Sequence, residues 1–343
     1  MKKLIYISFL LLVITACSES DDKGEPQEIK LSCSIDTTLS VTTRTAGDEL
    51  LPTNKKVYVW AQYYDNNNVY LNAWNLTTQS SGALSGSRQI YPTNGKHLNF
   101  YGLYNITGTY TEGTANQSNG TALPASLPKT VATTQNTDDV VNSQDLLYAS
   151  VTNWYAALGT ANLGFEHKMS RVIVELVELN EAPADKIASI KLNNVLPTAT
   201  VALPAGTVTA SGNPISINMG KRTKTVGNVS VPYGECIIPP QTIAANSGII
   251  SVTLTNDGKY VSHVLTFNPS FAVTFQPGMT TRFRLAVDHA KILGYTMAIA
   301  EWVDIPIFEV SKFVAVKLGP NGEVIDYESV PLDEEWEYGN EWD

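Results

Sequence analysis

The chain has 343 residues, of which 16% are charged and 43% are hydrophobic, and its formal net charge is −10. This length suits two domains of about 150 to 170 residues, each large enough to bury its own core. The acidic balance argues against binding to nucleic acid, because no basic excess is available to displace counterions from a phosphate backbone. Most of the net negative charge lies at the C-terminal end, since residues 322–343 contain nine acidic residues and no basic ones.

The N-terminus has the features of an export signal, predicted over residues 1–16. Two lysines precede Leu4–Ala16, an apolar run that is too short to cross a bilayer and is typical of a signal peptide. The residues Ile14–Ala16 before Cys17 resemble the lipobox of bacterial lipoproteins. The resemblance implies cleavage after Ala16 and lipidation of Cys17, with acyl chains such as palmitate as an outer-membrane anchor. An ordinary secretory signal with a chance cysteine is the alternative.

A strand with one buried face is predicted in Glu28–Thr43, after a polar tether. Apolar residues recur there at every second position: Ile29, Leu31, Cys33 and Ile35, then Leu39 and Val41 in the same phase. Arg44 follows this pattern and precedes the polar segment Thr45–Asp48. Residues 17–44 are therefore interpreted as one unit, a tether followed by a strand.

The remaining chain predicts an all-β fold. Short alternating or apolar runs recur between turn residues, and no segment of about 12 residues keeps a helical period. Strands are predicted at Lys56–Tyr64, Leu98–Tyr104, Thr280–Val287 and Tyr295–Trp302, with two more runs inside Leu163–Leu176. The polar segment Asn105–Asp139 is predicted to be a long exposed loop, either decoration or a binding surface.

Two hairpins are predicted in the second half of the chain. The first joins Ile249–Thr255 to Tyr260–Phe267 through Asn256–Gly258, where Asp-Gly supplies the positive φ angles of a tight turn. The second joins Phe313–Leu318 to Glu323–Val330 and precedes the acidic end of the chain. This terminal hairpin either completes its own sheet or reaches a neighbour's.

Six residues at 180–185 combine proline, alanine and charge and are interpreted as a linker. The predicted organisation is a signal peptide (1–16), a lipidated tether with a removable strand (17–44), an N-terminal β-sandwich (45–179), a C-terminal β-sandwich (180–312), and a hairpin with an acidic tail (313–343).

The sequence gives no positive support for catalysis. Its four histidines have no metal-binding spacing, and phosphate-loop, nucleophile-elbow and dinucleotide motifs are absent, so no metal or cofactor is expected. Asp138, Asp139 and Asp145 leave open a glycosidase pair, whose separation the sequence does not show. Cys33 and Cys236 are either bridged or two unpaired buried thiols.

The order of motifs resembles the fimbrillins of Bacteroidales, the subunits of protease-assembled type V pili. The matching segments are the lipobox at Cys17, TTRTAGD (42–48), IYPTNGKHLNFYGLY (90–104), DLLYA (145–149), FEHKMSRVIVEL (165–176), IIPPQT (237–242), FQPGMTTRFRL (275–285) and the strand ending at Trp302. The resemblance implies two transthyretin-like β-sandwich domains in tandem.

It also implies an assembly route. An arginine-specific protease would cut between Arg44 and Thr45, and the freed strand would leave a groove for a strand from another fimbrillin subunit, identical or paralogous. The candidate donor residues are Phe313, Val314, Val316, Leu318, Val324, Ile325, Tyr327 and Val330. The expected location is the outer membrane at the cell surface for the lipid-anchored precursor, and then the fimbrium.

Two other functions stay open at this point. One is a fimbrial tip or accessory surface lipoprotein that binds a glycan or host protein through the Asn105–Asp139 loop. The other is a surface glycan hydrolase. The terminal hairpin favours a polymerising subunit, because a tip subunit has no need to donate a strand.

Overall fold

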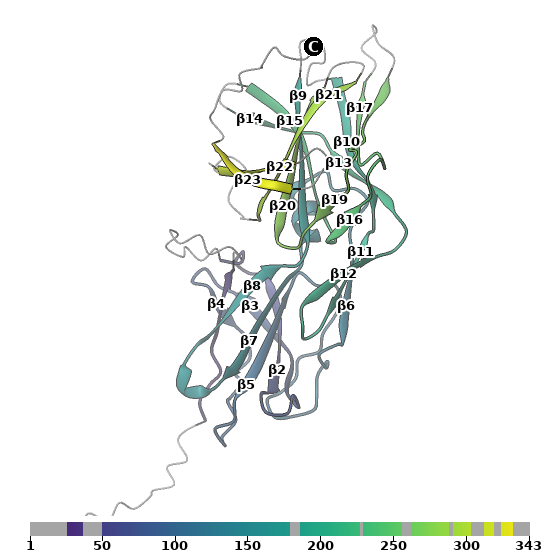
Figure 1. The fold of residues 1–343 in the computed structure, drawn as a ribbon. Coiled ribbons are helices and arrows are strands. Elements are labelled where there is room, and N and C mark those ends of the chain that lie inside the picture. Colours follow the sequence, from purple (N-terminus) through teal and green to yellow (C-terminus); the bar gives the residue numbers. More distant parts are fainter. Residues whose placement is uncertain are drawn as a thin grey trace, which may run out of the picture.

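The computed structural model describes residues 26–36, 50–178, 186–226, 229–255, 262–287, 291–302, 312–318 and 324–331. Its secondary structure is 56% strand and 5% helix, which confirms the all-β prediction. Two lobes are visible, with β2–β5, β7 and β8 in one and most of the later strands in the other (Figure 1). The described residues include no helix long and apolar enough to span a membrane.

The lower lobe in Figure 1 is a closed barrel with the strand order β1-β4-β3-β2-β5-β7-β8. Alternate side chains of these strands fill its interior, as a period of two requires, and Phe100 and Phe165 are among the fully buried ones. The strands are β1 (Leu31–Ile35), β2 (Lys56–Tyr63), β3 (Val69–Thr78), β4 (Ala83–Ser85), β5 (Leu98–Tyr104), β7 (Leu147–Trp154) and β8 (Ala161–His167), with the 3-10 turn η1 (Ala156–Leu158) between the last two.

The segment predicted as a loop over Asn105–Asp139 covers part of the barrel's outer surface. The indole Nε1 of Trp60 donates a hydrogen bond to the carbonyl of Thr121 at 2.9 Å, and Tyr110 meets the Trp60 ring edge-on at 5.6 Å. The segment also contains β6 (Ser126–Thr130) and the first residues of α1 (Asp138–Gln144). The loop prediction is therefore wrong at its C-terminal end, because a five-residue strand and a seven-residue helix are too short to show a period.

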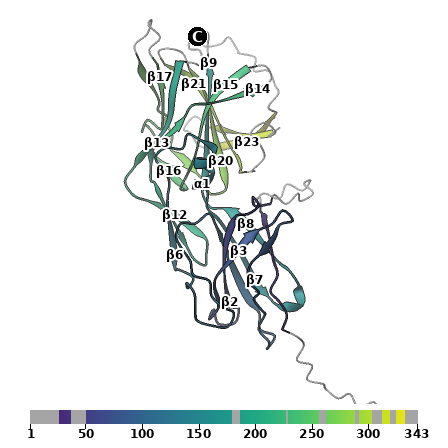
Figure 2. The same ribbon diagram turned by 180° about the vertical axis from the view of Figure 1, so that it is seen from behind.

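The other lobe places a four-stranded sheet and a seven-stranded sheet around a second apolar core (Figure 2). The four-stranded sheet has the order β13-β10-β17-β18, formed by β10 (Ile187–Val195), β13 (Ile215–Gly220), β17 (Ile250–Leu254) and β18 (His263–Phe267). The predicted hairpin is confirmed by the antiparallel pairing of β17 with β18. Its turn, Asn256–Gly258, lies outside the described residues.

The seven-stranded sheet has the order β14-β15-β9-β20-β21-β22-β23. Its strands are β9 (Ser170–Glu178), β14 (Arg222–Val226), β15 (Val229–Ile238), β20 (Met279–Val287), β21 (Ile292–Glu301), β22 (Lys312–Leu318) and β23 (Val324–Pro331). Two smaller sheets join β6 with β11 (Thr198–Ala202) and β12 (Thr207–Ser211), and β16 (Gln241–Ile243) with β19 (Val273–Phe275).

The chain passes from the barrel into the seven-stranded sheet between His167, where β8 ends, and Ser170, where β9 begins. β9 lies between β15 and β20, so all its sheet partners come from the later part of the chain. The sequence pattern placed β9 before the predicted boundary, because hydrophobic alternation does not reveal the partner of a strand. The linker at 180–185 is outside the described residues, and the division into domains stays a prediction.

Candidate assembly site

Strand β1 closes the barrel. It pairs in parallel with β8 from Leu31 opposite Ala161 to Ile35 opposite Phe165, and it meets β4 in an antiparallel contact on its other side. No other strand of the described residues joins β4 to β8. Removing β1 would therefore open the barrel along its whole side.

One face of β1 is buried, as its alternating sequence predicts. Ile29, Leu31, Cys33 and Ile35 expose only 2%, 3%, 2% and 6% of their surface, and all four belong to the apolar cluster inside the barrel. Each large aliphatic side chain contributes about 1.5–3 kcal/mol when fully buried, so the three in this set contribute roughly 5–9 kcal/mol. Leu39 and Val41, which continue the pattern, lie outside the described residues.

Polar contacts also attach β1 to both neighbours. The amide of Cys33 donates to the carbonyl of Gly82 at 2.8 Å, and the amide of Asp36 donates to the carbonyl of Phe165 at 2.8 Å. The side-chain amide of Asn162 on β8 donates to the hydroxyl of Ser34 at 3.0 Å. A barrel without β1 would leave two unpaired strand edges, which favour pairing with another strand.

Two glycines allow β1 to approach its neighbours closely. Gly82 has φ +78°, and a Cβ atom there would lie 3.1 Å from the carbonyl oxygen of Cys33. A Cβ atom on Gly164 would lie 2.0 Å from a carboxylate oxygen of Asp36. A larger residue at position 164 would therefore displace the Asp36 carboxylate, just after the end of β1.

Cys33 and Cys236 are both free and buried, which decides between the two alternatives that the sequence left open. The thiol of Cys33 lies 3.4 Å from the carbonyl oxygen of Gly82, and burial raises its pKa to about 11. Burial likewise raises the pKa of Cys236, in the core of the other lobe. Cys33 therefore acts as an apolar side chain of the β1 strand.

A pocket of about 440 Å³ lies where β1 ends, at the junction of the lobes. It is lined by residues that include Asp36, Glu166, Lys168, Glu301 and Trp302. His167 beside it contacts the Asp145 carboxylate at 2.9 Å and stacks on Trp302 at 4.2 Å between ring centroids. Within the described ranges, no three histidine, cysteine or acidic residues gather as metal ligands.

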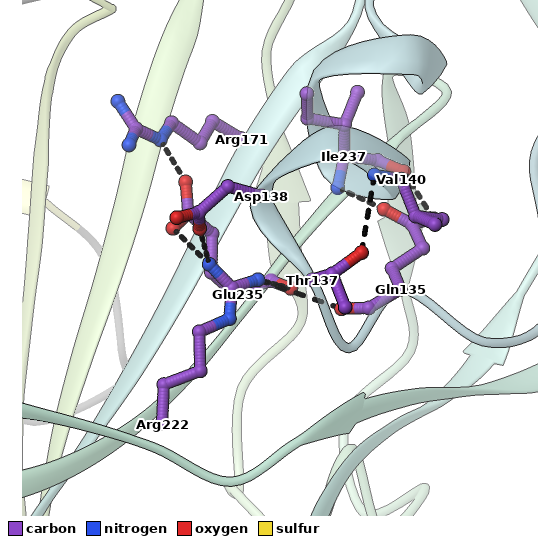
Figure 3. A network of polar contacts seen from close by, with 8 residues as sticks. All are labelled: Gln135, Thr137, Asp138, Val140, Arg171, Arg222, Glu235 and Ile237. Atoms are coloured by element: carbon purple, nitrogen blue, oxygen red, sulfur yellow. Dashed lines mark hydrogen bonds and ion pairs between the residues drawn. The ribbon is translucent and has the colours of Figure 1, made fainter.

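Two of the three carboxylates that the sequence leaves open as a glycosidase pair have structural partners. Asp145 pairs with His167, and Asp138 contacts Arg222 at 2.5 Å. Figure 3 shows Asp138 in the network that fastens the start of α1 to the seven-stranded sheet. In that network the buried side chain of Gln135 accepts from the amide of Ile237 at 2.8 Å and donates to its carbonyl at 3.0 Å. No local sequence pattern predicts this attachment.

The donor candidates lie far along the chain from β1, in the hairpin of β22 and β23. Phe313 pairs with Val330 and Val316 with Tyr327, which confirms the predicted hairpin. β22 meets β21 at one residue pair, Ala298 with Ala315, so within one chain the hairpin extends its own sheet. Cys17, Arg44 and Thr45 lie outside the described residues.

Comparison with known proteins identifies the kind of chain this is. A family model described as fimbrillin-like matches residues 43–302. A solved structure of a protein assigned to cell adhesion from Bacteroides ovatus is 13% identical with a TM-score of 0.58, and the match covers 82% of this chain and 100% of that one. A similarly assigned protein from Bacteroides uniformis is 16% identical with a TM-score of 0.55, covering 80% and 99%. The fimbrial anchor protein Mfa2 from Porphyromonas gingivalis is 14% identical with a TM-score of 0.41, covering 81% and 98%. No curated protein matches the chain.

Proposed function

The chain belongs to the fimbrillin-like family, and we propose that it is a structural, non-catalytic subunit of a cell-surface fimbria. In this proposal it is exported as a lipoprotein anchored in the outer membrane through Cys17, cut between Arg44 and Thr45 by an arginine-specific protease, and polymerised by donor-strand exchange. The observation that carries the proposal is that β1, which ends at Ile35, nine residues before Arg44, is the strand that closes the barrel.

The energetics of β1 favour exchange over simple loss. Its aliphatic side chains contribute roughly 5–9 kcal/mol of burial, which is comparable to the whole stability of a typical domain. A cut chain that lost β1 without a substitute would be marginal. A strand from another subunit that restores both the apolar contacts and the edge hydrogen bonds is therefore the state expected to accumulate.

The terminal hairpin is suited to be that substitute. Among the described residues, β22 pairs with β21 only at Ala298 and Ala315, whereas β21 pairs with β20 from Met279 to Val287. Releasing the hairpin therefore breaks few backbone hydrogen bonds. Because the hairpin and the β1 groove are on different lobes, repeated donation joins subunits head to tail into an open filament.

Limited proteolysis tests the proposal. We expect an arginine-specific protease to convert the precursor to a chain that begins at Thr45 and then forms a ladder of oligomers. Arg44→Ala should abolish both changes. Arg88→Ala, which removes an exposed arginine elsewhere, is the matched control and should assemble normally.

A second variant tests the terminal hairpin as the donor strand. A chain cut at Arg44 but truncated after residue 312 should stay monomeric, because it lacks the donor hairpin. Oligomers of normal length from this variant would exclude Phe313–Val330 as the donor. Assembly of the uncut Arg44→Ala chain would contradict the role of β1.

A further inference from the structure

The end of the barrel that points away from the other lobe, at the bottom of Figure 1, carries exposed aromatic and amide side chains. We call this end the barrel rim; it is formed by residues 63–69, 91–98 and 153–160. Three of the six exposed large hydrophobic side chains among the described residues lie here, since Tyr64, Val69 and Leu158 expose 51%, 42% and 46% of their surface. Connections at one end of a rigid scaffold are a common place for binding residues.

Strand register brings two aromatic residues to the mouth of the barrel at this rim. Tyr63 on β2 pairs with Leu98 on β5, which pairs in turn with Trp154 on β7. Leu98 belongs to the apolar cluster inside the barrel, and the half-buried rings of Tyr63 and Trp154 pack against that cluster. Neighbouring strands lie about 4.8 Å apart, so the two aromatic residues leave the backbone roughly 10 Å from each other. The mouth of a β-barrel is a frequent place for a small ligand.

His97 is the centre of the rim and holds two of its side chains in place. Its ring stacks on Tyr155, with 4.3 Å between the centroids and 12° between the planes, and its Nδ1 lies 2.6 Å from the side-chain carbonyl oxygen of Asn153. Because that oxygen only accepts, Nδ1 is the donor, and the amide nitrogen of the exposed Asn153 side chain is left to donate to a ligand. The amide of Tyr64 donates to the carbonyl of His97 at 3.0 Å, which attaches the β2–β3 turn to the same centre.

The charged and polar groups of the rim are suited to a neutral ligand. The Nζ of Lys96 lies 3.2 Å from the carboxylate of Asp65, and both side chains are exposed, so each balances the charge of the other. Three exposed asparagines, Asn66–Asn68, follow Asp65 on the turn and interrupt the apolar surface. A large continuous apolar patch is typical of a surface that binds protein or membrane. Aromatic rings that alternate with amides instead fit a ligand that has both C–H faces and hydroxyl groups.

We propose that the barrel rim binds a neutral hexopyranose as a glycoside. The C–H faces of the sugar pack on the rings of Tyr64 and Tyr155, and its hydroxyl groups form hydrogen bonds with the amide of Asn153 and with the Lys96–Asp65 pair. The stack and the hydrogen bond made by His97 hold Tyr155 and Asn153 before the sugar arrives, which lowers the entropic cost of binding.

This site is separate from the parts of the chain that the proposed assembly uses. Its residues belong to β2, β5, β7 and the connections beside them, whereas the exchanged strand is β1. Sugar binding therefore needs neither the cut at Arg44 nor polymerisation, and its test on the uncut chain stands or falls independently of the proposed function. In a filament, repeated copies of the rim would add avidity to a weak single site.

Saturation-transfer difference NMR on the uncut full chain tests the site. Methyl β-galactopyranoside, methyl β-glucopyranoside and methyl α-mannopyranoside are titrated separately, and at least one should bind with a millimolar dissociation constant, as is expected for so small a ligand. Glucuronate should bind no more tightly than methyl β-glucopyranoside, because Lys96 is already paired with Asp65. Absence of saturation transfer to all three neutral glycosides, or tighter binding of glucuronate, would overturn the proposal.

Substitutions at the rim locate the binding. Tyr155→Ala should weaken it by at least about fivefold, whereas Tyr155→Phe, which keeps the ring, should not. Asn153 has φ +60°, a conformation that glycine adopts readily, so Asn153→Gly removes the amide without straining the backbone and should also weaken the binding. Tyr295→Ala, which removes a side chain 42% exposed on the other lobe, is the matched control and should leave the binding unchanged.

The urea midpoint of each variant shows that it is folded before its binding is compared with that of the wild type. Binding that survives both Tyr155→Ala and Asn153→Gly would overturn the proposal by placing the sugar elsewhere. A loss with Tyr295→Ala equal to the loss with Tyr155→Ala would do the same.

Discussion

Shortening Leu31 to alanine should weaken the precursor without weakening the assembled fimbria. Leu31 exposes 3% of its surface inside the barrel and belongs to the cluster that β1 completes. Leu→Ala changes at such sites cost about 2–5 kcal/mol, since the lost transfer free energy is joined by the cost of the cavity. If β1 leaves on cleavage, the same substitution has no effect on the polymer, because Leu31 is no longer part of it.

Urea unfolding followed by tryptophan fluorescence measures the difference. The uncut Leu31→Ala chain should unfold at a lower urea concentration than wild type. The exposed change Leu158→Ala should alter the free energy of unfolding by at most about 0.5 kcal/mol. Phe165→Ala, at the fixed wall of the groove, should weaken both precursor and polymer. Equal destabilisation of precursor and polymer by Leu31→Ala would refute the departure of β1.

Two further predictions concern buried ionisable groups. Burial raises the pKa of Cys33 from an ordinary value near 9 to about 11, so its neutral thiol stabilises the fold below pH 9 and this contribution is lost as the pH rises through 11. The free energy of unfolding should therefore fall less between pH 9 and 11 in Cys33→Ala than in wild type. An equal fall in both proteins would contradict the prediction. Burial alone would raise the pKa of Glu175, but Arg282 and the other cations around it lower that pKa overall. Glu175→Gln should therefore lower the free energy of unfolding in urea by about 3–5 kcal/mol, because it removes the carboxylate that these buried cations share. Asp65→Asn, in an exposed ion pair, should lower it by at most about 1 kcal/mol.

The sequence predicts local structure here better than it predicts partnerships. The two-residue period of Ile29–Ile35 correctly predicts a strand whose apolar face is buried, although Ser34 on the other face is buried too. Antiparallel strand pairing confirms both predicted hairpins. Strand β3 was not predicted, because Asn72 and Asn75 interrupt its apolar pattern; both are engaged by the segment that packs on the barrel.

The partners of a strand are long-range properties, and local patterns do not encode them. Nothing in the alternation of β9 indicates that it joins β15 and β20, and nothing in the separate charges of Arg171, Glu235 and Arg222 predicts their contact. The junction pocket is assembled from six separate chain segments for the same reason. Cys17 and Arg44 rest on sequence motifs alone and stay predictions.

The family match itself has boundaries that agree with an exchange of strands. It runs from residue 43 to residue 302, and so it begins after β1 and ends before β22. The two elements outside it are the strand that closes the barrel and the hairpin that is tied to its own sheet at one residue pair. Both can be removed without breaking either apolar core into parts, because the strands on either side of each element remain joined through the rest of their sheet. In the proposed assembly route, the subunit would lose the first element by proteolysis and lend the second to a neighbour, while the central folded body would stay the same in precursor and fimbria.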